Sequence, residues 1–392
     1  MKLKVALFCT TVLEHGGGLE KYFMELSKNL CEKFDVQVDV VTMDEDFTMK
    51  IVNLLSIYRF KKHDKSIIQK LPTENILAKL GSANYIKCKN TNDLITTLNK
   101  YDLVYSKNEI LEAFLLKFLV GYKNIPKIIF GCHTSLHYSI DNSFRSSIRN
   151  FLYGKTIYSF LTSGVHAFHT LNTTDENILK SYFNGKPIYK IYNPFNFESF
   201  LQNLSGVESK FNFSKDKIKI LWLGILHTIK GTDRLSNIIK EVNKNDLSKN
   251  LEWIIAGDGQ DRIMIDELSK VEGNIEVLGF VQSELVPDLI NHVDLVISTS
   301  RSESFGYTVL EANALNKPFF SFRTQGQSEI IQDNVNGVIF ESEESFSKGI
   351  CDFISGKYKF ENIAEKVRPR FNSDFIYSQI FKMFEEVFYA KQ

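Results

Sequence analysis

The segment 301–315, RSESFGYTVLEANAL, places Glu303 and Glu311 eight positions apart, directly after the apolar run DLVISTS. Residues 304–306 lie between them, where a turn is expected to lead into a helix. Backbone N–H groups at a helix N-terminus are unpaired and partly positive, so they suit an anion such as a diphosphate. Gly306 lets a ligand approach the backbone closely. A carboxylate before the helix can accept hydrogen bonds from sugar hydroxyls, and one inside it can hold both ribose hydroxyls. Spacing alone also fits two ordinary glutamates near a helix start.

Three other segments carry residue types suited to the same chemistry. Lys230 precedes a glycine after an apolar run, where its ammonium either neutralises a phosphate or faces solvent in an ordinary turn. Gly17 and Gly18 follow the first apolar run and fit an anion-binding loop or a plain tight turn equally well. His133 ends the run KIIFGCH, where a histidine is as often structural as catalytic.

Strand-like and helix-like segments alternate along most of the chain, which predicts parallel strands joined by crossover helices. The opening segment LKVALFC is a short, mainly apolar run, as expected of a strand buried on both faces. Residues 44–100 fit the rhythm poorly and are predicted to be irregular, with short helices. A single helix is expected near 144–160. The predicted strands of the first half are 3–9, 36–43, 101–106, 127–133, 165–170 and 188–193.

A second series of strands begins near residue 217 with KIKILWLG and ends with NGVIF, and the stretch 194–216 between the two series is predicted to be a linker. We therefore expect an α/β protein with two Rossmann-like, doubly wound parallel-sheet domains, 1–195 and 196–370. A C-terminal helix over 371–392 is expected to pack back on the first domain. Ligands bind beyond the carboxyl ends of such strands, so the two domains are expected to face one cleft.

Charge and cysteine content restrict the protein class. The 392-residue chain has no net charge, but residues 1–196 hold 25 basic and 18 acidic residues, and residues 197–392 hold 22 and 29. The positive first half is either a chance feature of a lysine-rich chain or a surface for something anionic, such as lipid; no nucleic acid partner is expected. Five cysteines without a C-x-x-C pair argue against a disulfide framework or zinc site and fit a reducing compartment. No run approaches the ~18 apolar residues of a membrane span.

Several segments, in order along the chain, resemble the retaining glycosyltransferases of family 4, which have the GT-B fold and belong to the glycosyl transferases of group 1. GGLEKYFMELSKNL (17–30) is similar to the family's G-G-x-E loop and helix. ILWLGILHTIKGTDRL (220–235) is similar to its G-R-L-x-x-x-K-G segment, and ESFGYTVLEANALNKPFF (303–320) to its E-x7-E signature. The resemblance covers both halves and is clearest over residues 218–340.

The resemblance implies a role for each matched residue. Glu303 would contact the donor sugar, Glu311 would hold the ribose, and Lys230 would neutralise the diphosphate. His133 matches a family histidine near the donor sugar, which makes Glu303, Lys230 and His133 the expected catalytic residues. The other donor-binding positions that the resemblance implies are Gly17, Gly18, Val281, Phe305, Gly306 and Tyr307.

One position departs from the family pattern. The family often has arginine directly after the glycine of G-R-L, and this chain has Ile225. A lost charge-assisted contact is worth about 1.5–3 kcal/mol, or about ten- to a hundredfold in rate if it acts only in the transition state. His227 or Arg301 would be the compensating cation. The alternatives are a catalytically dead sugar-nucleotide-binding protein and a GT-B nucleotide-sugar epimerase.

The expected activity is transfer of a sugar, in a hexosyltransferase-like reaction, from a nucleotide-sugar donor to a glycan or lipid-linked acceptor in polysaccharide or glycoconjugate synthesis. No D-x-D motif lies in a strand-end loop, and residues 44–46 are interpreted as a solvated turn. No metal ion or other cofactor is therefore expected, because Lys230 and a helix start can stabilise the leaving diphosphate. Retention, as in the family, implies front-face attack, with the leaving phosphate accepting the acceptor's proton.

Residues 142–161 predict a basic, amphipathic helix, which either lies in an anionic membrane interface or packs on the sheet with its arginines in solvent. The expected location is cytoplasmic, with peripheral contact at the inner face of the membrane. The apolar positions of this helix are Phe144, Ile148, Phe151 and Leu152, and the basic ones are Arg145, Arg149 and Lys155.

Overall fold

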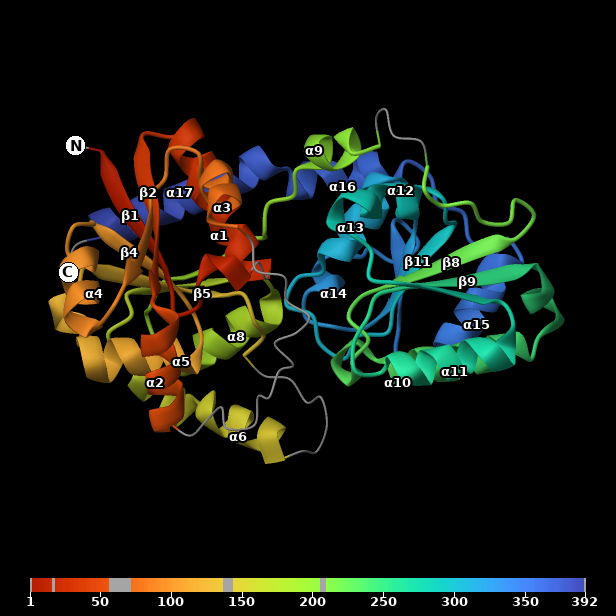
Figure 1. Cartoon of the computed structure of the whole chain (residues 1–392), viewed down its shortest axis with the longest axis horizontal. Coiled ribbons are helices and arrows are strands. Elements are labelled where there is room, and N and C mark those ends of the chain that lie inside the picture. The colour runs from red at the N-terminus through yellow and green to blue at the C-terminus, as the bar shows by residue number, and fades with distance from the viewer. Residues whose placement is uncertain (1, 16–17, 56–71, 137–143, 205–208, 391–392) are drawn as a thin grey trace. The chain divides into compact units, whose positions relative to one another are not determined.

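The computed structural model describes residues 2–15, 18–55, 72–136, 144–204 and 209–390, and the chain divides into two compact units (Figure 1). The first unit contains residues 1–137, 147–191 and 374–392, and the second contains residues 138–146 and 192–373. Each unit is built around one parallel sheet with helices on both faces, so the predicted α/β fold of two Rossmann-like domains is confirmed.

The sheet of the first unit has the strand order β3-β2-β1-β4-β5-β6-β7, and every pairing is parallel. Its strands are β1 (Leu3–Cys9), β2 (Val36–Met43), β3 (Tyr85–Cys88), β4 (Leu103–Lys107), β5 (Lys127–Cys132), β6 (Ala167–Thr170) and β7 (Ile188–Lys190). Its helices are α1 (Gly18–Lys33), α2 (Glu45–Leu55), α3 (Thr73–Leu80), α4 (Thr91–Leu98), α5 (Ile110–Phe114), the π-helical turn η2 (Leu115–Val120), α6 (Phe144–Leu152), α7 (Lys155–Leu161), α8 (Thr173–Tyr182) and α17 (Ser373–Tyr389). Short 3₁₀ turns are η1 (Leu13–His15) and η3 (Tyr122–Asn124).

Two local predictions for this unit need correction. The described residues of the region 44–100 include the predicted short helices, α2, α3 and α4, but also the strand β3, which was not predicted and which pairs with β2 at the edge of the sheet. The helix expected near 144–160 is two helices, α6 and α7, because Gly154 has an extended backbone (ψ 149°) that ends one helix and begins the next.

The sheet of the second unit has the order β10-β9-β8-β11-β12-β13, again entirely parallel. Helices α10, α11 and α15 cover one face, and α12, α13 and α16 cover the other (Figure 1). The strands are β8 (Ile218–Leu223), β9 (Leu251–Ala256), β10 (Ile275–Gly279), β11 (Leu295–Ser298), β12 (Phe319–Phe322) and β13 (Gly337–Phe340). The helices are α9 (Phe197–Gln202), η4 (Thr228–Lys230), α10 (Thr232–Asn243), η5 (Asp246–Asn250), α11 (Arg262–Glu272), η6 (Ser283–Leu285), α12 (Val286–Asn291), α13 (Tyr307–Ala314), α14 (Gln327–Ile330), α15 (Glu343–Ile354) and α16 (Ile363–Phe371).

The last helix, α17, packs on the first unit, and Figure 1 shows it in blue among the red and orange elements. Its Phe381 stacks on Phe34 with ring centres 4.7 Å apart. The ammonium of Lys127 donates hydrogen bonds to three carbonyl groups at its C-terminal end, Val387, Phe388 and Ala390. A cation at this end satisfies carbonyl groups that the helix leaves unpaired. Among the described residues, no helix has the length and apolar character needed to cross a bilayer.

Two buried amides fix α13, the helix that carries Glu311. The side-chain N–H of Asn336 donates to the side-chain oxygen of Asn313 at 2.8 Å. Asn313 in turn donates to the carbonyl groups of Lys317 and Asn336. Both amides are fully buried, so every one of these bonds supports the position of α13 against the strand β13.

Candidate functional site

The site residues of the second unit lie in loops that follow two neighbouring strands. The strand order runs outward from β8 to β10 on one side and from β11 to β13 on the other. The sheet therefore reverses its order between β8 and β11, and ligands of such sheets bind beyond the carboxyl ends of the strands at this point. Residues 224–231 follow β8, and residues 299–306 follow β11.

Lys230 and Glu303, from these two loops, form an ion pair. The ammonium nitrogen of Lys230 lies 2.5 Å from Oε1 of Glu303. The hydroxyl of Ser300 donates to the same carboxylate oxygen at 2.8 Å. Both charged side chains are partly exposed, so a ligand can reach them. The structure thus brings together a cation and a carboxylate that the sequence places 73 positions apart.

Further contacts fasten the two loops to each other. The hydroxyl of Thr299 lies 2.9 Å and 2.8 Å from the carbonyl oxygens of Lys230 and Gly231. Thr299 also accepts a hydrogen bond from the indole N–H of the buried Trp222 at 3.0 Å. Gly231 is in the left-handed region, with φ 70°, and a Cβ there would lie 2.0 Å from the carbonyl oxygen of Thr299. Only glycine therefore allows the two loops to approach this closely.

Arg301 and His227, the two candidates for a cation that compensates for Ile225, both have hydrogen-bond partners within the protein. The guanidinium of Arg301 donates to both carboxylate oxygens of Asp233, at 2.7 Å and 2.6 Å, and to the carbonyl of Thr228. Its hydrogen bonds lower the pKa of Asp233. The ring of His227 accepts a hydrogen bond from the backbone N–H of Ile229 through Nδ1. Ile225 itself is 62% exposed, so an apolar side chain stands in solvent at the position of the family's arginine.

The residues at the start of α13 have distinct structural roles. Gly306 precedes the helix with φ 109°, a conformation that favours glycine. The ring of Phe305 is buried against Tyr192 and Phe371, with ring centres 6.1 Å and 6.0 Å away, so only its backbone is suited to ligand contact. Tyr307 opens the helix and Glu311 lies in its second turn, half-buried. Val281 is half-buried in the loop after β10.

The other predicted site residues belong to the first unit. His133 follows β5, and its Nε2 lies 2.8 Å from the hydroxyl oxygen of Tyr105. Its ring packs on Tyr22 with centres 4.4 Å apart. Burial lowers the pKa of His133 well below its usual value, and nearby His169 and Lys107 lower it further. Gly18 begins α1 in open space, since a Cβ at this position would meet no heavy atom within 4 Å, while Gly17 lies outside the described residues.

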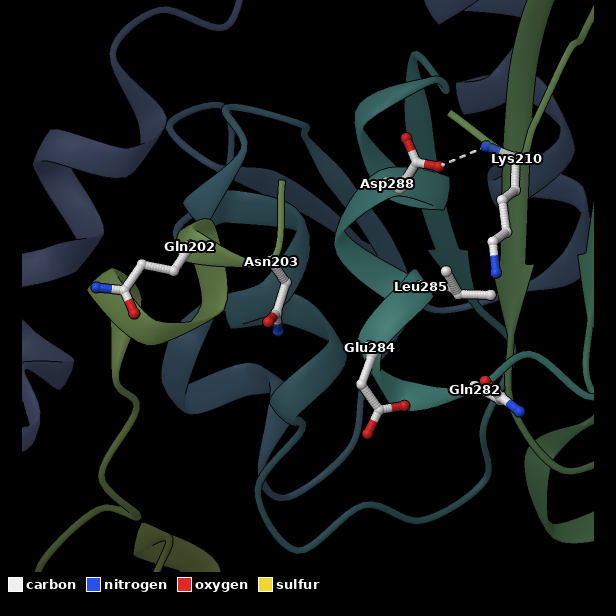
Figure 2. A pocket seen from close by; sticks show the side chains of 7 residues that line it. All are labelled: Gln202, Asn203, Lys210, Gln282, Glu284, Leu285 and Asp288. Carbon is white, nitrogen blue, oxygen red and sulfur yellow. Dashed lines mark hydrogen bonds between the residues drawn. The ribbon is translucent and has the colours of Figure 1, made fainter. Parts of the chain in front are cut away.

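A recess of about 490 Å³ in the second unit does not contain any predicted site residue. Figure 2 shows Gln282, Glu284, Leu285 and Asp288 from the η6–α12 segment on one side, and Gln202 and Asn203 from the end of α9 on another. The carboxylate of Asp288 accepts a hydrogen bond from the backbone N–H of Lys210 at 3.1 Å. This recess is open and its polar side chains lie at the surface, so it lacks the convergent buried groups of a ligand site.

The described part of the chain contains no group of three or more histidine, cysteine, aspartate or glutamate side chains arranged to hold a metal ion. The five cysteines are free thiols.

Comparison with solved structures defines the class of fold. The chain matches Anabaena HepE, solved in complex with UDP and glucose, with a TM-score of 0.67 and 16% identity over 98% of this chain and 99% of that one. It matches sucrose-phosphate synthase of Thermosynechococcus elongatus with a TM-score of 0.69 and 14% identity over 99% and 100%. These similarities establish the GT-B fold that the sequence predicts.

Comparison of sequences identifies the family. Residues 207–370 match the family described as glycosyl transferases group 1. The whole chain is 23% identical to an uncharacterised glycosyltransferase of Methanocaldococcus jannaschii, over 99% of this chain and 98% of that protein. It is 22% identical to the N-acetyl-alpha-D-glucosaminyl L-malate synthase of Bacillus anthracis, over 99% and 97%. The predicted family resemblance is thereby confirmed.

The close approach at Gly231 gives a test of the loop geometry. We expect Gly231→Ala to lower the melting temperature by about 6 °C or more, because its methyl group collides with a backbone carbonyl that cannot rotate away. Gly273→Ala is the matched control: Gly273 has φ 71°, but a Cβ there meets no atom within 4 Å. Equal melting temperatures for the two variants, measured by circular dichroism, would contradict the packing described for Thr299.

Proposed function

We propose that this protein is a retaining, metal-independent glycosyltransferase that moves a sugar, in a hexosyltransferase-like reaction, from a nucleotide-diphosphate sugar to a glycan or lipid-linked acceptor. The observation that carries the proposal is the ion pair of Lys230 and Glu303 at the switch point of the second sheet. A cation and a sugar-binding carboxylate are both needed where a glycosyl diphosphate is cleaved. The group 1 family of residues 207–370 supports the same activity.

In the proposed reaction, the second unit binds the donor. Lys230 and the backbone N–H groups at the start of α13 stabilise the diphosphate as its negative charge increases in the transition state. Glu303, in the loop before α13, accepts hydrogen bonds from the donor sugar, and Glu311, in the second turn of α13, accepts those of the ribose. Val281 offers its backbone to the base. HepE was solved with UDP and with UDP-glucose, which supports a nucleotide-sugar donor here.

The chemical step is a front-face substitution at the anomeric carbon. A bond forms between an acceptor hydroxyl oxygen and the anomeric carbon while the bond from that carbon to the diphosphate oxygen breaks. The proton of the acceptor hydroxyl passes to the leaving phosphate, so no protein carboxylate has to act as the nucleophile. Because Lys230 and a helix start supply the stabilising charge, the step requires no metal ion.

A second candidate is a protein that binds a sugar nucleotide without turning it over. The exposed Ile225 supports it, since Arg301 and His227, the nearest alternatives to the family's arginine, are held by Asp233 and by the backbone of Ile229. Incubating the purified protein with a panel of nucleotide sugars separates the candidates. A transferase hydrolyses one donor slowly without acceptor, an epimerase isomerises it, and a binding protein does neither.

The ribose assignment predicts a specific kinetic defect. Glu311→Ala removes a carboxylate that would accept two hydroxyl hydrogen bonds, so we expect the donor Michaelis constant to rise about tenfold or more. Glu344→Ala, an exposed glutamate on α15 of the same unit, is the control and should leave donor kinetics unchanged. Donor kinetics of the Glu311 variant equal to those of the control would refute the assignment.

Metal independence is tested directly by chelation. We expect the rate of donor turnover to stay within about twofold of its starting value in EDTA, because Lys230 carries the charge that a metal ion would otherwise neutralise. Loss of turnover in EDTA with recovery on adding manganese or magnesium would show that the diphosphate is bound through a metal.

The first unit is proposed to contact a membrane peripherally, through the described part of the predicted basic helix that belongs to it, residues 147–161, and the neighbouring turn η2. One expected contribution is wrong: Arg149 faces inward, where it donates to the carbonyl of Ser135 at 2.9 Å and lies over the ring of Tyr153. Phe118 and Phe160 are 52% and 56% exposed, with ring centres 6.1 Å apart. The ammonium of Lys117 lies 4.9 Å from the ring centre of Phe160. Aromatic rings beside a lysine suit an anionic lipid interface.

This surface predicts salt-sensitive binding to lipid vesicles. We expect the protein to sediment with vesicles containing phosphatidylglycerol but much less with phosphatidylcholine alone. Replacing both Phe118 and Phe160 by serine should weaken binding about tenfold. The control replaces Ile263 and Val271 by serine, because both are highly exposed on α11 of the second unit. Equal recovery of all three proteins with the vesicles, or of none, would contradict the proposed surface.

A further inference from the structure

A chain of hydrogen bonds runs through the first unit and ends at His133. The ring Nε2 of His169 lies 2.8 Å from the carbonyl oxygen of Ile191. The other ring nitrogen of His169, Nδ1, lies 2.6 Å from the hydroxyl oxygen of Tyr105. That hydroxyl oxygen is also 2.8 Å from Nε2 of His133. The four groups come from β4, β6, the end of β7 and the end of β5, so four adjacent strands contribute to one line of polar atoms.

The carbonyl group of Ile191, at one end of these hydrogen bonds, determines where each hydrogen along them lies. A carbonyl oxygen can only accept, so Nε2 of His169 must carry a hydrogen. Burial lowers the pKa of His169 to about 4, so its ring is neutral at pH 7 and Nδ1 has a lone pair. Tyr105 must then donate its hydroxyl hydrogen to that lone pair. The hydroxyl oxygen of Tyr105 has only acceptor capacity left, and it therefore receives the hydrogen of Nε2 of His133.

Tight packing holds this arrangement in place. Tyr105 and His169 are completely buried. A Cβ at Gly131 would lie 2.1 Å from the hydroxyl oxygen of Tyr105, so the glycine of β5 makes the space in which that hydroxyl sits. The ring of Tyr105 contacts Phe23 on one side and Phe384 of α17 on another, with ring centres 6.1 Å and 5.7 Å away. This packing holds the ring of Tyr105 so that its hydroxyl oxygen stays beside His169 and His133.

We infer that Tyr105 and His169 are positioning residues that hold His133 as the neutral tautomer protonated on Nε2, which leaves Nδ1 as a hydrogen-bond acceptor. Such a histidine recognises a hydroxyl group by accepting its hydrogen, and it does not serve as a proton donor. The assignment of that hydroxyl to the donor sugar rests on the proposed function. The assignment of the tautomer rests only on the hydrogen bonds described above. No hydrogen bond of Nδ1 to another described residue is present.

The surroundings of His133 favour the neutral ring. Its aromatic neighbours are Tyr22, Phe23 and Tyr105, none of which is charged at neutral pH. The other titratable groups that act on it are His169 and Lys107, and positive charge on either opposes protonation of His133. Nδ1 of His133 is therefore available as an acceptor throughout the neutral pH range. Ligand recognition by His133 should not change between pH 6 and pH 8, although an unperturbed histidine changes its charge in this range.

The experiment is a long-range ¹H–¹⁵N correlation spectrum of the full-length protein labelled with ¹⁵N-histidine, which distinguishes protonated from bare ring nitrogens. We expect His133 and His169 both to show a protonated Nε2 and a bare Nδ1 at pH 7. A protonated Nδ1 on His133 in the wild-type protein would overturn the inference, whatever the protein's activity.

Tyr105→Phe supplies the second arm. Losing the hydroxyl should leave His133 as a mixture of tautomers and lower kcat/KM for the donor about tenfold. Tyr158→Phe is the matched control, because Tyr158 is equally buried and its hydroxyl donates to Asn108 at 2.8 Å, outside this chain of bonds. The control should keep the wild-type tautomer and rate. An unchanged His133 spectrum in Tyr105→Phe would refute the positioning role.

The two arms separate failure of this inference from failure of the proposed function. If no nucleotide sugar is turned over while the spectrum shows the expected tautomer, the proposed function fails and the tautomer assignment stands. If a donor is turned over but His133 carries its hydrogen on Nδ1, the function stands and the inference fails.

Discussion

The ion pair between Lys230 and Glu303 forms because the loops that follow β8 and β11 lie close together. The other residues of the candidate donor site depend on the same close approach of these loops. A partly exposed ion pair contributes little stability by itself. Here its geometry is fixed by neutral contacts, because Thr299 reaches the backbone of the opposite loop and Gly231 leaves room for the Thr299 carbonyl. Charges held in place by uncharged contacts are already oriented when a ligand arrives, which is the condition for stabilising a transition state at low cost.

Most strands can be predicted from the sequence because a strand buried on both faces is rich in apolar and β-branched residues. LKVALFC and VQVDVVTM are recognisable as β1 and β2 for this reason, although a few polar residues interrupt both. The strand β3 escapes prediction because it lies at the edge of the sheet, where only its last residue is buried and no apolar run is required. The break between α6 and α7 depends on the backbone of a single glycine, which periodicity does not report.

The residues of the candidate site can be predicted from the sequence where several motifs occur in order. The partner of a charged residue cannot be predicted when that partner is distant in the sequence. The motifs single out Lys230 and Glu303, and the structure places them in contact. Arg301 and Arg149 are predicted to be cations that face a ligand or a lipid. Arg301 is instead held by Asp233, and Arg149 by the carbonyl of Ser135. A sequence shows that a residue is charged but not which group of the folded chain holds it.

The same distinction between total and local charge explains how the second half of the chain, with 22 basic and 29 acidic residues, can suit an anionic ligand. Exposed charges act over only about 8 Å at physiological ionic strength. Acidic residues such as Glu341 and Asp246 are solvated at the surface and are paired with Arg323 and Lys249, so they contribute little beyond their own surroundings. At the switch point Lys230, which is paired with Glu303, and the backbone N–H groups at the start of α13 would act on a bound ligand at contact distance. The proposed preference for an anion would therefore depend on a few oriented groups, whereas the recognition inferred for the first unit depends on a neutral, half-buried histidine whose protons are fixed by its neighbours.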